Sequence, residues 1–586
     1  MAGYDIHRLA EILRDGVYKV PEYQRNYAWE HDRQVKDLWE DLENVGTGES
    51  SDHYTGTLIV KQMDNITKLG KTYKRFELID GQQRLTSLTM LLYCICERLI
   101  SLGSDEAKKT AQNIMSEYIF DADTDIYKLI LNEGDDGFFR DVILKSPSDE
   151  MTGRRATTAS EKRLKDAKRF FSEKIRSLSY EELQELIGKV LNKLIAIRYE
   201  VGTEAEAGLI FEVMNDRGRP LSQLDKVKNY LIYLSYKGGD DDLAHSINES
   251  WGEILRNTAS IDRFDEDSLL RFHWIMYTGE SKEYDVHRRL KVRLKLGTSD
   301  ILSKVRNYVD SLKEASYVFR ELNNPEGAFP DWRGHDGTVI RERLAGLHRL
   351  QVMAAFMPLL TACRIVFRDA PDLFSKVVSA CEVFAFRVYK VANRRADTGQ
   401  STFHWRANFL FGRRGSHRSK LESLCEEAMS DIGGYISIYC PEDELADGLK
   451  NHNILQWMER YEVRYLLYEL ERHKCHEAGE VPLRWKDLEK AQIEHIWPES
   501  PRGYEGWPDR RKQEHDLYVG QIGNLTLTFW NPELSNKDFS EKREMYKDSS
   551  LRIQRELAEQ DKWTPAEVKE RNAEIVNFAQ GRWAAP

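Results

Sequence analysis

The chain has 586 residues, of which 41% are hydrophobic and 31% charged, and its formal net charge at pH 7 is −11. A chain of this length and composition predicts a globular protein of about three to four domains. The negative charge argues against a protein that coats nucleic acid non-specifically, although local positive patches can still bind it.

The sequence also argues against a membrane or disulfide-stabilised protein. The longest apolar runs, 88–96 and 352–363, are too short to span a bilayer and predict buried helices. The N-terminus lacks the charged-then-apolar layout of a signal peptide. The seven cysteines are scattered and form no C-x-x-C pair, which indicates a reducing compartment and argues against a structural zinc. We therefore expect a soluble cytoplasmic protein that binds no membrane.

In chain order, residues 1–235 alternate short strands with helices. The β-branched and apolar residues of 54–60 and 75–79 predict two strands. The second strand is followed by the turn Asp80-Gly81-Gln82-Gln83-Arg84 and then by apolar residues at helical spacing. Gly70-Lys71-Thr72 is similar to part of a Walker A loop, but it precedes a strand instead of following one, so we expect a hairpin loop there.

The turn at 80–84 is a candidate anion site. Backbone N–H groups at a helix N-terminus, together with the helix dipole, attract negative charge. Arg25 and Arg84 could add the bidentate contacts that phosphate favours, and Lys228 on a later helix could complete the pocket. Residue chemistry alone therefore indicates a phosphate or nucleotide site, and the alternative is an ordinary tight turn before a buried helix.

Residues 236–450 show an almost entirely helical pattern with few strand signals. Within it, residues 394–420 hold seven positive charges and one Asp, interleaved with aromatic residues. Such a stretch could contact DNA, through Arg394, Arg395, Arg413 and Arg414, or it could be a solvated helical surface.

Residues 451–586 contain the most specific motif. Glu494 and His495 end an apolar segment, Gly523-Asn524-Leu525 begins a second strand, and Asn531 and Asn536 follow. This order is that of the ββα-metal site of HNH nucleases, in which a histidine and one divalent ion hydrolyse a phosphodiester. The predicted catalytic residues are His495, Asn524, Asn531 and Asn536, and the predicted metal ligands are Glu494 and Asn531.

Three points of that assignment stay open. Either Asn531 or Asn536 could be the last metal ligand. Asn524 is expected to orient His495, but it could instead cap a turn. Glu494 takes the place of an Asp beside the base, so its contact with the metal is uncertain.

Several strings of the sequence resemble the GmrSD modification-dependent restriction enzymes. Those similar to the GmrS-type, ParB-related domain are PEYQRNYAW, HYTGTLIV, FELIDGQQRLTSL and IFEVMNDRGRPLSQLDKVKN, and those similar to the GmrD-type HNH domain are IEHIWP and IGNLTLTFWNPELSNKDFSEK. The fusion of both domains in one chain also resembles the BrxU and SspE phage-defence proteins. The resemblance implies that the first domain binds and hydrolyses NTP. The implied nucleotide-binding residues are Gln24, Arg25, Trp29, Thr55, Gly56, Asp80, Gly81, Gln82, Gln83, Arg84, Asn215, Arg217, Gly218 and Lys228.

We therefore predict a mostly helical α+β protein. Its parts are a ParB-like α/β domain over 1–235, a helical connecting region over 236–450 and an HNH domain over 451–586. The resemblance implies an NTP-stimulated, metal-dependent endonuclease of type IV restriction. Its substrate would be foreign double-stranded DNA with hydroxymethylated or glucosylated cytosines.

The implied cofactors are Mg or Mn and an NTP (ATP, GTP or CTP), and a homodimer is possible. The alternatives are an NTP-dependent DNA-binding defence switch whose HNH fold does not cut, and a nuclease directed at RNA.

Overall fold

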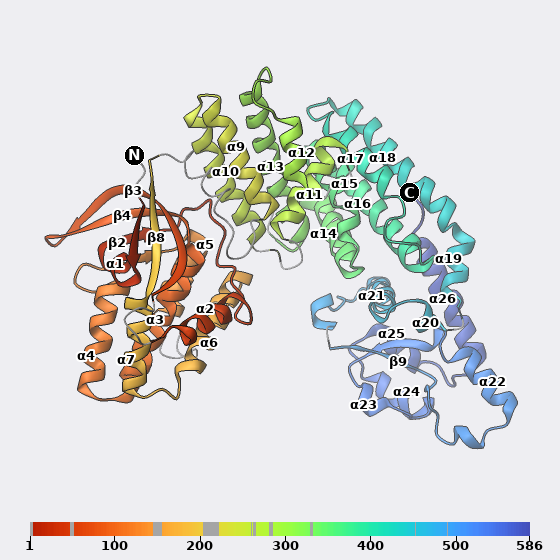
Figure 1. Ribbon diagram of the computed structural model, residues 1–586. Helices are drawn as coiled ribbons and strands as arrows, with labels where there is room; N and C mark the ends of the chain where they lie inside the picture. Colours follow the sequence, from red (N-terminus) through yellow and green to blue (C-terminus); the bar gives the residue numbers. More distant parts are fainter. Residues whose placement is uncertain are drawn as a thin grey trace. The chain divides into compact units, whose positions relative to one another are not determined.

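The computed structural model describes residues 4–46, 52–144, 155–202, 222–259, 261, 265–280, 285–327, 332–451, 453–488 and 490–586 (Figure 1). It is mostly helical, with a mixed sheet in the N-terminal region, which confirms the α+β class. The chain forms two compact units, residues 1–273 with 282–320 and residues 274–281 with 321–586. The helices of the predicted connecting region are therefore divided between the two units, and the division into three domains stays a prediction.

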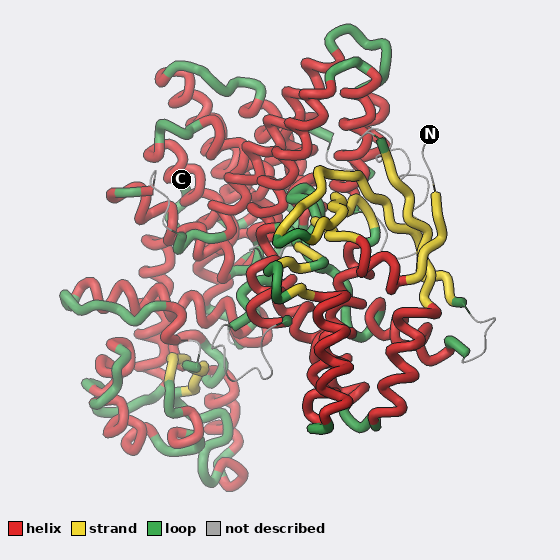
Figure 2. Tube along the Cα trace, turned by 90° about the vertical axis from the view of Figure 1, so that its left-hand side faces the viewer, coloured by secondary structure: helices red, strands yellow, loops and turns green. Residues whose placement is uncertain are grey.

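The first unit contains a six-stranded sheet. Its strands, in spatial order, are β1 (Tyr4–Arg8), β8 (Leu194–Val201), β3 (His53–Lys68), β4 (Lys71–Asp80), β2 (Gly16–Lys19) and β7 (Leu129–Ile130). The pairs β3–β4 and β1–β8 are antiparallel, whereas β3–β8, β2–β4 and β2–β7 are parallel. Figure 2 shows these strands gathered in one sheet and a second, much shorter hairpin elsewhere in the chain.

A tight turn joins the two longest strands of this sheet. Lys68 pairs with Lys71, so Leu69 and Gly70 form a two-residue connection, and both have positive φ angles of 50° and 75°. This is the geometry of a hairpin turn whose twist matches the flanking strands. Lys71 Nζ lies 2.9 Å from Asp121 Oδ2. The expected hairpin loop at Gly70-Lys71-Thr72 is confirmed.

The core of the first unit lies between one face of the sheet and the helix α3 (Gln82–Leu102), which is buried for most of its length. This helix is long and apolar enough to cross a membrane, but 72% of its most apolar window is buried inside the protein, as expected of a core helix. The other elements of the domain are α1 (Leu9–Asp15), α2 (Gln34–Asn44), α4 (Asp105–Ile114), η1 (Met115–Ile119), β5 (Phe120–Asp121), β6 (Ile126–Tyr127), α5 (Glu133–Phe138), η2 (Phe139–Ile143), α6 (Ala159–Ile175), α7 (Tyr180–Gly188) and η3 (Lys189–Lys193). After them come α9 (Gln223–Lys237), α10 (Asp241–Ala259), α11 (Glu266–Thr278), α12 (Val286–Arg293) and α13 (Ile301–Asn323).

The second unit begins with a helical layer and ends with a region that contains a short hairpin. The layer consists of α14 (Gly334–Arg349), α15 (Met353–Val366), α16 (Pro371–Phe384), η5 (Ala385–Val391), α17 (Gln400–Phe411), α18 (Arg418–Tyr439) and α19 (Glu442–Leu449). The last region contains α20 (Ile454–Trp457), α21 (Arg460–Glu477), η6 (Trp485–Leu488), β9 (Gln492–His495), η7 (Tyr504–Gly506), α22 (Asp509–Tyr518), η8 (Ile522–Asn524), β10 (Leu525–Thr528), α23 (Asn531–Leu534), α24 (Phe539–Lys547), α25 (Arg552–Ala558) and α26 (Pro565–Arg582).

A buried carboxylate joins these two regions. Glu382 on α16 is fully buried and accepts hydrogen bonds from Tyr465 on α21 and from the Trp583 indole. Arg343 on α14 and Arg582 on α26 neutralise its charge at 3.4 and 3.0 Å. Because a buried charge is costly unless it is paired and hydrogen-bonded, these four helices are fixed to one another at this point.

Candidate nuclease and nucleotide sites

The predicted strand–strand–helix order is present around His495. Strands β9 and β10 are antiparallel, with His495 opposite Leu525 and Glu494 opposite Thr526, and α23 begins at Asn531. Successive residues of a strand point to opposite faces. The alternation therefore separates His495 from Glu494.

His495 is half-buried, and its pKa is lowered. Burial is the main cause, and the neighbouring Lys542, Arg460 and His515 act in the same direction, while Glu499 opposes them. The imidazole is therefore neutral at physiological pH. A neutral imidazole is the form that can accept a proton from water.

Glu494, the predicted metal ligand, pairs with a buried lysine, and its role in metal binding stays a prediction. Lys542 on α24 is fully buried, and its Nζ lies 2.5 Å from Glu494 Oε1 and 2.7 Å from the His495 carbonyl oxygen. Burial raises the pKa of Glu494 and lowers that of Lys542, while each partner opposes the shift of the other. Glu494 and Lys542 thus form an internal ion pair that joins β9 to α24.

Asn524 makes its hydrogen bonds within the fold, and its catalytic role stays a prediction. Its side chain is buried, Oδ1 accepts from the Trp497 N–H at 2.8 Å and the Trp563 Nε1–H at 3.0 Å, and Nδ2 donates to the Trp497 and Val519 carbonyls. These bonds use the amide of Asn524 for backbone and indole groups, and not for the imidazole. Asn524 therefore positions His495 only indirectly, by holding the chain that leaves β9.

The two remaining asparagines differ in their surroundings. Asn531 Nδ2 donates to Gln492 Oε1 at 2.7 Å, which leaves the Asn531 amide oxygen for another partner. Asn536 is exposed and follows Ser535, which has a positive φ of 36°. The choice between the two as a metal ligand stays open.

The sequence interpretation missed a histidine near this site. His515 on α22 is buried, its Nε2–H donates to the Pro498 carbonyl at 2.9 Å, and its ring contacts those of Trp497, Tyr504 and Trp507. This aromatic cluster orders the segment between the two strands. Its signal in the sequence was the density of aromatic residues over 497–518.

The predicted anion turn has the expected geometry. Gly81 is the N-cap of α3, with a left-handed φ of 93°, so the first amides of the helix carry no side-chain cap. Arg84 Nη1 lies 3.4 Å from the Thr57 carbonyl, and burial lowers the pKa of Arg84, which Asp80 partly opposes. Burial raises the pKa of Asp80, whereas the Gly81 N–H and the charges of Arg84 and Arg25 lower it. Asp80, Gly81, Arg84 and Arg25 are therefore close together.

Gly56 is required by the same arrangement. Its φ is +113°, and a Cβ at this position would lie 2.7 Å from Arg84 Nη2. The adjacent Thr55 is half-buried on β3. A side chain at position 56 would displace the guanidinium from the turn.

Three glutamines of the predicted nucleotide site point inward, and their role in nucleotide binding stays a prediction. Gln24 Nε2 donates to the Ile79 carbonyl at 2.7 Å, and Gln82 Nε2 donates to the Arg25 carbonyl at 3.1 Å. Gln83 accepts from the Ala28 N–H at 2.7 Å and donates to the Asn26 carbonyl at 3.2 Å. All three are buried. They therefore position the segment 24–28.

Two more of the predicted residues are also internal. Trp29 belongs to the core beneath the sheet. Lys228 is buried on α9, where its Nζ donates to the Tyr23 carbonyl at 3.3 Å and lies over the Tyr23 ring. Lys228 thus anchors α9 to the segment before Arg25. Asn215, Arg217 and Gly218 lie outside the described residues.

The basic stretch 394–420 is less positive than its composition suggests. Three of its arginines pair with carboxylates: Arg395 with Asp397, Arg406 with Glu427 and Asp431, and Arg418 with Asp372 and Glu422. Arg394 lies over the Tyr439 ring, Arg413 over Phe409 and Arg414 over Phe411. Cation–π stacking preserves the positive charge, so these arginines could still contact DNA.

Models of two protein families match the chain. The GmrSD restriction endonuclease, N-terminal domain, matches residues 7–232, and the GmrSD restriction endonucleases, C-terminal domain, matches residues 440–578. No curated protein matches it. The two matched domains define a restriction endonuclease that acts on modified DNA and defends against phage. The chain belongs to the GmrSD family.

Proposed function

We propose that the chain is an NTP-stimulated, metal-dependent HNH endonuclease that cuts phage DNA carrying hydroxymethylated or glucosylated cytosine. The observation that carries this proposal is the neutral His495 at the end of β9. The chain at His495 is held at two points: Lys542 donates a hydrogen bond to the His495 carbonyl, and Asn524 accepts one from the Trp497 N–H.

In the proposed mechanism, His495 accepts a proton from the attacking water. A general base of this kind accelerates hydrolysis by about 10²- to 10⁴-fold. Asn531 and Asn536 offer amide oxygens, which fit Mg²⁺ or Mn²⁺, since such ions accept oxygen ligands and keep several waters. When bound, the ion supplies stabilisation of charge on the leaving oxygen.

In the first unit, the proposed phosphate site is the uncapped start of α3 with Arg84 and Arg25. The Arg84 guanidinium, which the absence of a side chain at Gly56 allows to lie beside β3, and its burial support an anionic ligand here. Binding of NTP would stimulate cleavage, and the arginines that stack in 394–420 would contact the DNA backbone.

The direct test uses phage DNA with glucosylated hydroxymethylcytosine and unmodified DNA, with and without Mg²⁺ and each NTP. His495→Ala should abolish cutting and leave NTP turnover intact. His473→Ala is the matched control, because His473 is an exposed histidine on α21 of the same unit. An unchanged cutting rate in His495→Ala would exclude His495 as the base.

Two further outcomes separate the alternatives. If His495→Ala retained phage defence, the HNH fold would act as a binding switch. If labelled RNA offered in parallel were cut in place of DNA, the substrate class would be wrong.

A further inference from the structure

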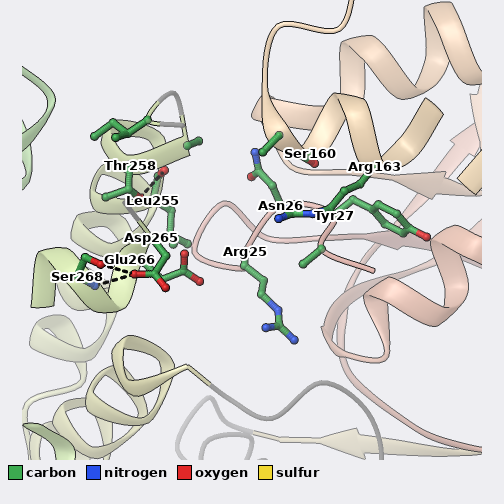
Figure 3. Close-up of a pocket in the computed structure, with 14 residues that line it drawn as sticks. Arg25, Asn26, Tyr27, Ser160, Arg163, Leu255, Thr258, Asp265, Glu266 and Ser268 are labelled. Carbon is green, nitrogen blue, oxygen red and sulfur yellow. Dashed lines mark hydrogen bonds between the residues drawn. The ribbon is translucent and has the colours of Figure 1, made fainter. Parts of the chain in front are cut away.

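A cavity of about 390 Å³ lies in the first unit beside Arg25 (Figure 3). Three parts of the chain line it: residues 25–28, the start of α6, and the end of α10 with the start of α11. Its volume falls in the range of small-molecule sites, about 300–1,000 Å³. Of its lining residues, only Arg25 is among those that the sequence predicts to bind a ligand.

The wall formed by residues 25–28 is shared with the proposed phosphate site. Gln82 and Gln83, on the first turn of α3, hold the backbone of this segment through Arg25, Asn26 and Ala28. The charge of Arg25 also lowers the pKa of Asp80 in the turn. Arg25 therefore lies near the phosphate turn and lines the cavity as well.

The cavity is preformed on this side. Asp135 is buried, and its Oδ2 accepts from the Tyr27 N–H and from the Ser160 hydroxyl, each at 2.6 Å. One carboxylate thus ties the segment 25–28 to the start of α6. A ligand that enters the cavity would not have to order these two walls, and preorganisation of this kind favours binding.

The opposite wall carries two carboxylates. Asp265 lines the cavity, and its Oδ1 accepts from the Ser268 N–H at 2.8 Å and the Ser268 hydroxyl at 2.6 Å. Glu266 is half-buried, and the nearby carboxylates of Asp225, Asp267 and Asp265 add to the effect of burial in raising its pKa. Two acceptors on one side and Arg25 with Arg163 on the other suit a ligand with hydrogen-bond donors at one end and negative charge at the other (Figure 3).

We propose that this cavity binds the nucleoside of an NTP whose phosphates lie at residues 80–84. Glu266 and Asp265 accept hydrogen bonds from ribose hydroxyls or from N–H groups of the base, and Arg25 lies between the nucleoside and the phosphates. Leu255, Ala259 and Ala159 supply apolar contacts for the base. The assignment rests on the proposed NTP binding and adds to it the part of the chain that recognises the nucleoside.

The test is isothermal titration calorimetry on the full chain with ATP, GTP, CTP, UTP, their 2′-deoxy forms and inorganic tripolyphosphate. Glu266→Gln should weaken binding of the preferred NTP about tenfold, since it removes one charge-assisted hydrogen bond. Tripolyphosphate binding should stay unchanged. Asp242→Asn is the control, because Asp242 is an exposed acid on α10 away from the cavity lining.

Ala159→Phe gives a second probe, because a large side chain at this lining position fills the cavity without removing a charge. It too should weaken NTP and spare tripolyphosphate. Loss of discrimination between an NTP and its 2′-deoxy form in Glu266→Gln would assign the contact to the ribose. Retained discrimination between bases in Ala159→Phe would argue against the proposal.

The results separate this proposal from the one on which it rests. If the unaltered chain binds tripolyphosphate as tightly as every NTP, or if both cavity variants bind NTP normally, the nucleoside assignment is wrong and the phosphate site stands. If neither tripolyphosphate nor any NTP binds, or if Arg84→Ala leaves both affinities unchanged, the NTP site itself is wrong.

Discussion

The ion pair between Glu494 and Lys542 predicts a large local effect of a single substitution. The two side chains are 7% and 0% exposed, so Lys542→Met leaves a buried carboxylate without a partner. Breaking a buried pair from one side costs about 3–5 kcal/mol. Total domain stability is about 5–15 kcal/mol. We therefore expect the β9–β10 hairpin to open much more often in this variant.

The double variant Glu494→Leu with Lys542→Met should recover most of that loss, since a buried pair replaced by apolar residues is often neutral. Because the chain has two compact units, a single unfolding midpoint is not a suitable measure. Native-state hydrogen exchange of peptides over 492–528 reports the local free energy directly. Lys547→Met is the control, because Lys547 is an exposed lysine on the same helix and pairs with Glu544 at the surface.

A metal-binding role for Glu494 would make a different prediction. If Glu494 were a metal ligand, Glu494→Gln would lower the affinity for Mg²⁺ while hydrogen exchange stayed unchanged, and Lys542→Met would have little effect on stability. That pair of results would refute the structural role of Glu494.

Three further predictions concern other parts of the chain. Burial raises the pKa of Asp135 from 3.8 to about 6, so its stabilising contribution is present below pH 3.8 and is lost as the pH rises to 6. The stability of Asp135→Asn relative to the unaltered chain should therefore increase by about 3 kcal/mol between pH 4 and pH 6. Hydrogen exchange over 23–28 measures this difference, and parallel pH profiles of stability for the two chains would contradict it. Gly56→Ala should weaken NTP binding about tenfold, whereas Gly70→Ala, also at positive φ but with nothing within 4 Å of its Cβ, should not; equal affinities would remove Gly56 from the site. Arg413→Glu with Arg414→Glu should weaken DNA binding and reduce the slope of its salt dependence by about one to two units, and an unchanged slope would mark 394–420 as a solvated surface.

The elements of both sites could be predicted because local signals specify them. The β-branched and apolar residues of 54–60 and 75–79 predicted parts of β3 and β4, and the turn residues before apolar residues at helical spacing predicted the start of α3. The direction of the glutamine side chains could not be predicted in the same way. Helix α3 is buried on almost all sides, so the periodicity of its sequence does not separate an inward face from an outward one.

The ion pair of Glu494 could not be predicted for a different reason. Strand alternation already implies that Glu494 and His495 face opposite sides, so the sequence contained the information to separate them. Its partner was harder to find, because lysine is almost never fully buried and Lys542 lies 48 residues further along the chain. The one sequence signal for Lys542 is its helical spacing from Phe539 and Tyr546. Tyr546 belongs to an apolar cluster and Phe539 packs against it, so this spacing places Lys542 on the inward face of α24.

The buried Glu382 has a consequence for how the second unit is divided by experiment. Glu382 lies on α16 and its partners come from α14, α21 and α26, while the matched C-terminal family domain covers only 440–578. Glu382 lies before that range, and Arg582 and Trp583 lie after it. The matched family domain is therefore smaller than the compact unit that contains it. A fragment cut at the family boundaries would separate this carboxylate from the groups that neutralise it.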